Sequence, residues 1–134
     1  AVEYNEAADS LKYPNEKHIR NLRQLTFGGD NAEAYWSFDN TKLVFQSNNK
    51  SWGVQCDHIF YTTVGVDNLK ENKPTMISNG KGRTTCSYFL PGDSTVVYAS
   101  THLGGDACPA DPERVPGGKY LWPIFPTYDI FVAD

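Results

Sequence analysis

Long apolar runs and a surplus of positive charge are both missing from this sequence. No stretch approaches the roughly 18 apolar residues that a membrane-spanning helix needs. The 12 lysines and arginines are scattered and outnumbered by 16 aspartates and glutamates, which gives a formal net charge of −4. We therefore expect no membrane span, and the sequence argues against nucleic acid as a partner because phosphate binding needs a basic surface.

Familiar catalytic signatures are missing as well. The chain contains neither a Gly-x-Ser-x-Gly turn, which presents a nucleophilic serine, nor a His-Glu-x-x-His zinc motif. A cysteine–histidine pair would have to be assembled from Cys86 or Cys108 with His102, on loops whose geometry the sequence does not specify. We predict no catalytic residue, no cofactor and no metal site, so the chain is not expected to be an enzyme.

The sequence does contain a repeat. Ala34–Ser47 and Ser87–Ser100 align at an offset of 53 residues, and such a period is the mark of a repeated structural unit. The aligned positions are aromatic or aliphatic: Tyr35 with Tyr88, Trp36 with Phe89, Leu43 with Val96, Val44 with Val97 and Phe45 with Tyr98. Each copy places turn-forming residues between two short apolar runs, which predicts a tight β-hairpin.

The repeat extends beyond the hairpins. Cys56–Val64 and Tyr128–Ala133 have the alternating pattern of a third strand in each unit. Arg23–Phe27 and Thr75–Asn79 are short segments that run into glycine, and each is predicted to be the outer strand of the preceding unit. Four antiparallel strands repeated at about 40 to 50 residues are typical of β-propeller blades.

These segments together resemble the TolB-like β-propeller repeat. The resemblance rests on the RQLT segment, on the two hairpin turns and on the Asp-Ile-Phe-Val strand that begins at Asp129. The turn Ser37–Asn40 keeps a serine and an aspartate but lacks the family's proline and glycine, and Leu90–Asp93 keeps the proline but inverts the last two residues. Over Arg23–Asp134 the resemblance implies an all-β fold of two four-stranded blades in an incomplete ring.

The predicted domain organisation follows from these units. Residues 1–17 are expected to form an irregular arm, and residues 18–134 a propeller segment. Blade one covers about 30–79 and blade two about 83–134. A closed ring takes typically four to eight blades, so we expect the chain to belong to a longer polypeptide or a larger assembly.

Residues 101–127 form an insertion in the second unit. The second and third strands of the first unit are joined by about nine residues, whereas the equivalent link here has 27 residues and five of the eight prolines. Ordered loops of this length are commonly functional. With neighbouring loops, the insertion is predicted to supply a partner-binding surface made of Trp52, Arg83, His102, Tyr120 and Trp122.

The three cysteines favour a disulfide. We expect Cys86 to pair with either Cys56 or Cys108, leaving the third thiol unpaired. Zinc bound by the cysteines with His102 is a weaker alternative, because no cysteine pair has the short spacing of structural zinc sites. A disulfide, together with the opening residues Ala1-Val2-Glu3, which match what removal of a signal peptide would leave behind, predicts a periplasmic or extracellular protein.

The resemblance implies a non-catalytic scaffold that binds a protein partner, or the remaining blades of the same propeller. Two alternatives stay open. The chain is similar to the N-terminal propeller portion of a serine peptidase of the prolyl oligopeptidase type, which would make the whole protein an enzyme. It is also compatible with an accessory subunit of a membrane-associated complex.

Overall fold

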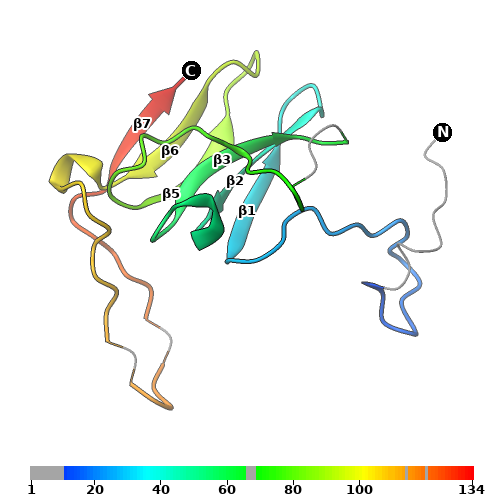
Figure 1. The fold of residues 1–134 in the computed structure, drawn as a ribbon, viewed down its shortest axis with the longest axis horizontal. Coiled ribbons are helices and arrows are strands. Elements are labelled where there is room, and N and C mark those ends of the chain that lie inside the picture. Colours follow the sequence, from blue (N-terminus) through cyan, green and yellow to red (C-terminus); the bar gives the residue numbers. More distant parts are fainter. Residues whose placement is uncertain (1–10, 66–68, 114, 120) are drawn as a thin grey trace.

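The strand order of the protein follows the sequence repeat (Figure 1). The computed structural model describes residues 11–65, 69–113, 115–119 and 121–134, which contain seven β-strands and two short 3-10 helices. The strands are β1 (Asn31–Trp36), β2 (Lys42–Ser47), β3 (His58–Thr63), β4 (Thr75–Met76), β5 (Thr84–Phe89), β6 (Val96–Ser100) and β7 (Asp129–Ala133); the helices are η2 (Lys50–Trp52) and η3 (His102–Gly104).

The strands form two antiparallel sheets. The first sheet has the order β1-β2-β3-β4 and the second has the order β5-β6-β7. The predicted all-β class, the two hairpins and both third strands are therefore confirmed. Within the described residues the second sheet ends at β7, and the two sheets do not close a ring.

The two sheets are equivalent in detail at the offset of 53 residues. The ladder between β1 and β2 and the ladder between β5 and β6 are interrupted by a bulge at the same place. The bulge residues Glu33 and Cys86 have φ values of 52° and 51°, in the left-handed region that most residues avoid. The repeat is thus a repeat of backbone conformation as well as of sequence.

A glycine with positive φ precedes the first strand of each unit, at equivalent positions. Gly29 has a φ of +66°, and a Cβ there would lie 2.5 Å from the Cα of Asn49. Gly82 has a φ of +62°, and a Cβ there would lie 2.8 Å from the backbone nitrogen of His102. Asn49 and His102 are themselves equivalent, so each unit requires glycine where its first strand crosses the loop that follows its second.

We expect Gly29→Ala to lower the free energy of unfolding by about 2–3 kcal/mol, because it combines a strained φ with backbone contact. Gly92→Ala is the matched control: φ there is +98°, but nothing lies within 4 Å of the added Cβ. Its cost should be limited to about 1–2 kcal/mol of backbone strain. Urea denaturation measures both, and equal losses would contradict the close approach at Gly29.

The hydrophobic core has two parts. Buried side chains between the two sheets form the first: Val44, Ile59, Phe89, Val96 and Tyr98. The second covers the outer face of the first sheet: Phe45, Trp52, Val54, Phe60 and Leu69. Because side chains alternate along a strand, the first sheet is buried on both faces, and its strand β2 is apolar at three successive positions.

Two expectations for outer strands turn out differently. Thr75–Asn79 supplies a strand, although the ladder with β3 covers only Thr75–Met76. Arg23–Phe27 forms no strand, so that prediction was wrong. The segment instead runs past the first sheet, where the carbonyl of Phe27 accepts a hydrogen bond from Asn49 Nδ2 at 3.0 Å. A strand needs a neighbouring strand to pair with, and none of the described residues supplies one there.

The part of the N-terminal arm that the structure describes is irregular. Residues 11–17 contain no strand, as expected for an irregular arm, whereas residues 1–10 lie outside the described residues. Among the described residues, no helix has both the length and the apolar character needed to cross a bilayer.

Candidate functional site

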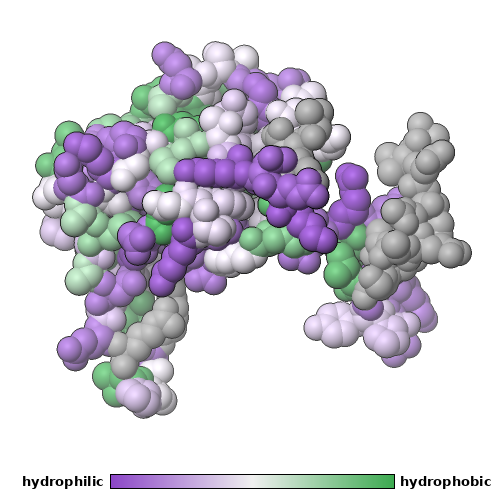
Figure 2. Space-filling model, in the orientation of Figure 1, coloured by the Kyte–Doolittle hydropathy of each residue, from purple (hydrophilic) through white to green (hydrophobic). Residues whose placement is uncertain are grey.

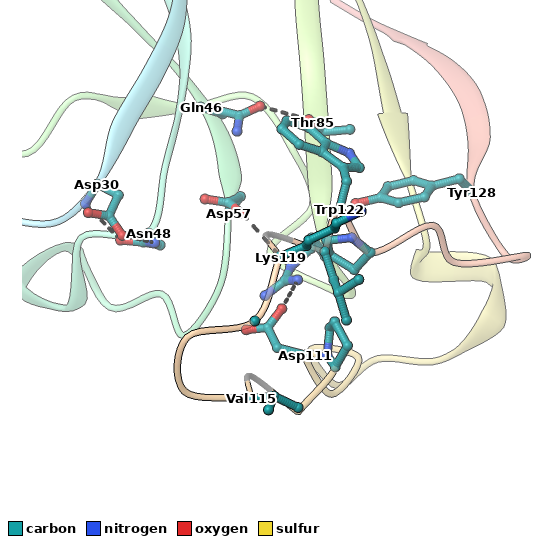
Figure 3. Close-up of a pocket in the computed structure, with 15 residues that line it drawn as sticks. Asp30, Gln46, Asn48, Asp57, Thr85, Asp111, Val115, Lys119, Trp122 and Tyr128 are labelled. Carbon is teal, nitrogen blue, oxygen red and sulfur yellow. Dashed lines mark hydrogen bonds and ion pairs between the residues drawn. The ribbon is translucent and has the colours of Figure 1, made fainter.

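A cleft of about 530 Å³ opens at one end of the two sheets, next to the base of the insertion (Figure 3). Residues that precede first or third strands line one part of it: Asp30, Asp57, Arg83 and Tyr128. Gln46 and Asn48 come from the end of β2, and Asp111, Lys119 and Trp122 come from the insertion. In antiparallel sheets these strand ends meet at one edge, which is why residues far apart in sequence converge.

Backbone hydrogen bonds hold Asp57 next to Arg83. Thr84 N–H donates to the carbonyl of Asp57 at 2.9 Å, which ties the start of β5 to the start of β3. Arg83 N–H donates to Thr101 Oγ1 at 2.9 Å, and the Arg83 carbonyl accepts from Thr101 N–H at 3.0 Å. The relative position of these two charged residues is therefore set by the sheets.

The Arg83 side chain lies deep in the cleft, with 12% of its surface exposed. Its Nη1 donates to Asp111 Oδ1 at 2.5 Å, and its guanidinium lies 5.6 Å from the ring centre of Phe125. Its Nε is 3.9 Å from Asp57 Oδ2, and this buried nitrogen has no hydrogen-bond acceptor. The guanidinium is thus fixed on one side and unsatisfied on the other.

The carboxylates around Arg83 differ in their environment. Burial raises the pKa of the Asp57 carboxyl above its ordinary value, while the charge of Arg83 opposes that rise and the charges of Asp111 and Asp30 add to it. The hydrogen bond to Asp111 raises the pKa of Arg83, which stays charged. The cleft therefore holds the buried Arg83 guanidinium among three carboxylates. Burial has its clearest effect on the pKa of Asp57.

The disulfide joins Cys56 to Cys108, with a Cα–Cα distance of 6.0 Å, and Cys86 is free and exposed. The expectation that Cys86 takes part in the bond was wrong. Cys86 is the bulge residue of β5, and its positive φ places it outside the regular alternation of the strand. The bond that does form ties the start of β3 to the insertion.

One group of described residues has the donor atoms of a metal site. The ligand atoms of Cys56, His58 and Cys108 lie within 4.8 Å of one another. The disulfide uses both sulfurs, so no thiolate is available as a ligand. His102 lies outside this group; its Nδ1 is 2.8 Å from Ser100 Oγ, and its ring packs 4.3 Å from that of Phe131.

Two serine–histidine pairs occur among the residues that the structure describes, and the serine of each pair is buried. Ser100 Oγ contacts His102 Nδ1, and Ser78 Oγ lies 3.1 Å from His58 Nδ1. Both serines are buried, and Ser78 also accepts a hydrogen bond from the backbone of Ile59. A substrate cannot reach either hydroxyl, so these pairs stabilise strand ends rather than activate a nucleophile.

The five residues predicted to bind a partner are not brought together as one surface. Arg83 and Trp122 both line the cleft, and Trp122 is 66% exposed. His102 is half-buried in η3, and Tyr120 lies outside the described residues. Trp52 is only 6% exposed, because η2 turns it into the core beside Phe45 and Phe60; it is a core residue and not a surface anchor.

The outer face of the second sheet is apolar and open. Ile130 and Val132 on β7 are 72% and 59% exposed, and Tyr88, Val97 and Ala99 lie on the same face. Their equivalents in the first sheet include Val44 and Ile59, which are completely buried because the second sheet covers them. In Figure 2, hydrophobic side chains reach the surface at the end of the molecule where β7 lies in Figure 1.

Sequence reasoning missed Asp57, Gln46 and Tyr128. One signal was present: Asp57 and Tyr128 stand directly before the third strand of each unit, so they occupy equivalent places at the edge where the loops gather. Gly82 joins parts of this edge: its carbonyl oxygen lies 3.1 Å from Cys56 Sγ, and a Cβ on it would lie 2.8 Å from the backbone nitrogen of His102.

Comparisons with known proteins yield no match. No protein-family model, no curated protein and no solved structure matches this chain.

Proposed function

We propose that this chain is a non-catalytic, protein-binding scaffold of the TolB-like β-propeller type, in which each sheet is one blade. The observation that carries the proposal is the open outer face of the second sheet. Exposed apolar surface of this kind marks a contact site in soluble proteins. The partner is a further sheet, supplied by the remaining blades or by another protein.

The contact between the two sheets supports this choice of partner. Val44 and Ile59 of the first sheet are covered by Phe89, Val96 and Tyr98 of the second. The open face repeats the covered one, with Val97 and Ile130 in place of Val44 and Ile59. A partner sheet with an aromatic and aliphatic face like that of Phe89 and Tyr98 would bury it in the same way.

The disulfide supports an oxidising compartment for this function. Disulfides persist in secreted and periplasmic proteins and are rare where thiols are kept reduced. The Cys56–Cys108 bond holds the insertion onto the sheets, and it would persist in a compartment where thiols are not kept reduced. The proposal therefore places the protein in the periplasm or outside the cell.

The proposal is tested by placing a photo-crosslinking amino acid at Val132 of the intact protein, in the cells that naturally produce it. We expect a crosslink to a β-strand of a further sheet, identified by mass spectrometry of the joined peptides, because that sheet covers Val132. The same probe at Leu103, which is 72% exposed on η3, is the control and should crosslink weakly. Equal crosslinking at both positions, or crosslinks from Val132 to no sheet, would rule out a partner on this face.

A further inference from the structure

Three metal-ligating side chains lie together at the start of β3: Cys56, His58 and Cys108. Their ligand atoms are all within 4.8 Å of one another. Cys56 and His58 are two positions apart where the chain enters β3, and side chains at this spacing in a strand-like segment point to the same side. The disulfide brings Cys108 to them from 52 positions along the chain. Two sulfurs and an imidazole nitrogen are donors that zinc prefers, and both sulfurs become available when the disulfide opens.

The distances fit one zinc ion once the S–S bond is broken. Zinc–sulfur bonds of about 2.3 Å at a tetrahedral angle place two thiolates about 3.8 Å apart. Two sulfurs that are no longer bonded separate to about 3.5–4.0 Å in any case, because non-bonded heavy atoms repel one another at shorter range. The Cα–Cα distance of 6.0 Å between Cys56 and Cys108 allows this small movement. Reduction therefore produces the separation of the sulfurs that a shared ion needs.

The surroundings of the three side chains complete and orient the group. The carbonyl oxygen of Gly82 lies 3.1 Å from Cys56 Sγ and 3.8 Å from Cys108 Sγ. These distances lie on either side of the roughly 3.6 Å that a shared tetrahedral zinc requires between sulfur and oxygen. Ser78 Oγ lies 3.1 Å from His58 Nδ1 and is itself held by a backbone hydrogen bond. It orients the imidazole through one nitrogen, as the partners of metal-bound histidines do, so that the other nitrogen can bind an ion.

The group is closed on the side of the sheet and reachable from the insertion. Cys56 and His58 are 3% and 2% exposed, whereas Cys108 is half-buried and belongs to the insertion. Cys108 is therefore the ligand that moves aside to admit an ion when the disulfide opens. The buried surroundings of the other two ligands strengthen the attraction between a divalent cation and thiolate, because the local dielectric constant is low.

We infer that the reduced chain binds one Zn²⁺ ion at this site through Cys56, His58 and Cys108. The carbonyl oxygen of Gly82 takes the fourth position, so zinc and the disulfide are alternative ways of closing the same site. Reduction adds two electrons and two protons to the S–S bond and gives two thiols, and zinc then releases both protons to solvent as it binds the thiolates. The zinc-bound chain keeps the insertion on β3 without a disulfide. This inference does not depend on the open face of the second sheet.

Zinc titration of the full chain tests the inference. A water-soluble phosphine opens the disulfide, is oxidised to its phosphine oxide with an oxygen atom from water, and is removed under nitrogen. We expect the reduced chain to take one Zn²⁺ from a chromophoric chelator, and the disulfide-bonded chain to bind zinc at least about a hundredfold more weakly. Co²⁺ in place of zinc should show thiolate-to-metal charge-transfer absorption and the intense visible bands of four-coordinate cobalt. Equal affinity of the two forms for zinc would overturn the inference.

Two pairs of matched variants, studied in the reduced chain, identify the ligands. Cys108→Ser should weaken zinc binding at least about a hundredfold, whereas Cys86→Ser should leave it unchanged, because only the first removes a ligand. His58→Gln should weaken it to a similar extent, whereas His18→Gln, at an exposed histidine, should not. The pairs also separate this site from an unfolded chain, which would bind zinc through whichever thiols and imidazoles it offers. Equal effects within either pair would overturn the inference.

Discussion

Trp52→Ala is expected to lower the free energy of unfolding by about 3–5 kcal/mol, which is typical of removing a large aromatic side chain from a core. Trp52 packs against Phe60 with ring centres 5.4 Å apart and against Phe45 with ring centres 6.3 Å apart. These rings form most of the cluster on the outer face of the first sheet, so removing the indole leaves a cavity in a closely packed group.

Trp122→Ala makes the same chemical change at the surface and is the control. Because Trp122 is largely exposed, its replacement should alter stability by no more than about 0.5 kcal/mol. Urea denaturation followed by circular dichroism measures both. A loss at Trp122 as large as that at Trp52 would show that the insertion belongs to the folded core.

Loss of the disulfide is the second large effect. The cysteines are separated by 52 residues, and replacing both with serine is expected to cost about 4 kcal/mol by releasing the unfolded chain from that loop. The double variant Cys56→Ser/Cys108→Ser is preferable to either single variant, because a single replacement leaves a reactive thiol. Its midpoint in urea should fall well below that of the wild type.

Cys86→Ser is the control for this experiment. Cys86 is exposed and unpaired, so its replacement should change stability by no more than about 0.5 kcal/mol. Thiol counting under denaturing conditions should find one free thiol per wild-type chain. If the Cys86 variant unfolds as easily as the double variant, or if a different cysteine is the free one, the assigned pairing is wrong.

The hairpins and third strands could be predicted because the pattern that encodes them is local. Alternating apolar residues on either side of a turn specify a hairpin, and the 53-residue offset showed that the chain does so twice. Arg23–Phe27 has a similar composition, but a strand also depends on a neighbour, and composition carries no information about whether that neighbour is there.

The cysteine pairing and the place of Trp52 depend on features that a pattern does not express. Cys86 stands at a bulge and has a positive φ. The one sequence feature that indicated an exposed Cys86 was its alignment with Glu33, a charged residue that has no reason to be buried. Trp52 is off the repeat and looked like a surface residue. Asn49 caps η2 by accepting from Ser51 N–H at 3.1 Å, and this short helix turns the indole inwards.

The cleft was the least predictable feature. Arg83 was identified from its loop, but its neighbour Asp57 is 26 positions away, and they meet only because β5 is bonded to the residue that precedes β3. Contacts between residues of the two units depend on how the sheets pack against each other. The sequence repeat alone does not specify that packing.

The two sheets meet through unlike surfaces: the face of the second that carries Tyr98 lies on the face of the first that carries Ile59. Such a heterologous contact has polarity, and two copies related by a two-fold axis cannot satisfy it, since each would keep one surface unmatched. The face of the first sheet that corresponds to the Tyr98 face carries Phe45, and Trp52 and Leu69 already cover it. Among the described residues, a second copy of the chain therefore offers no matching surface, so the open face of the second sheet requires a different partner, and a charge placed at Val132 should prevent that single contact.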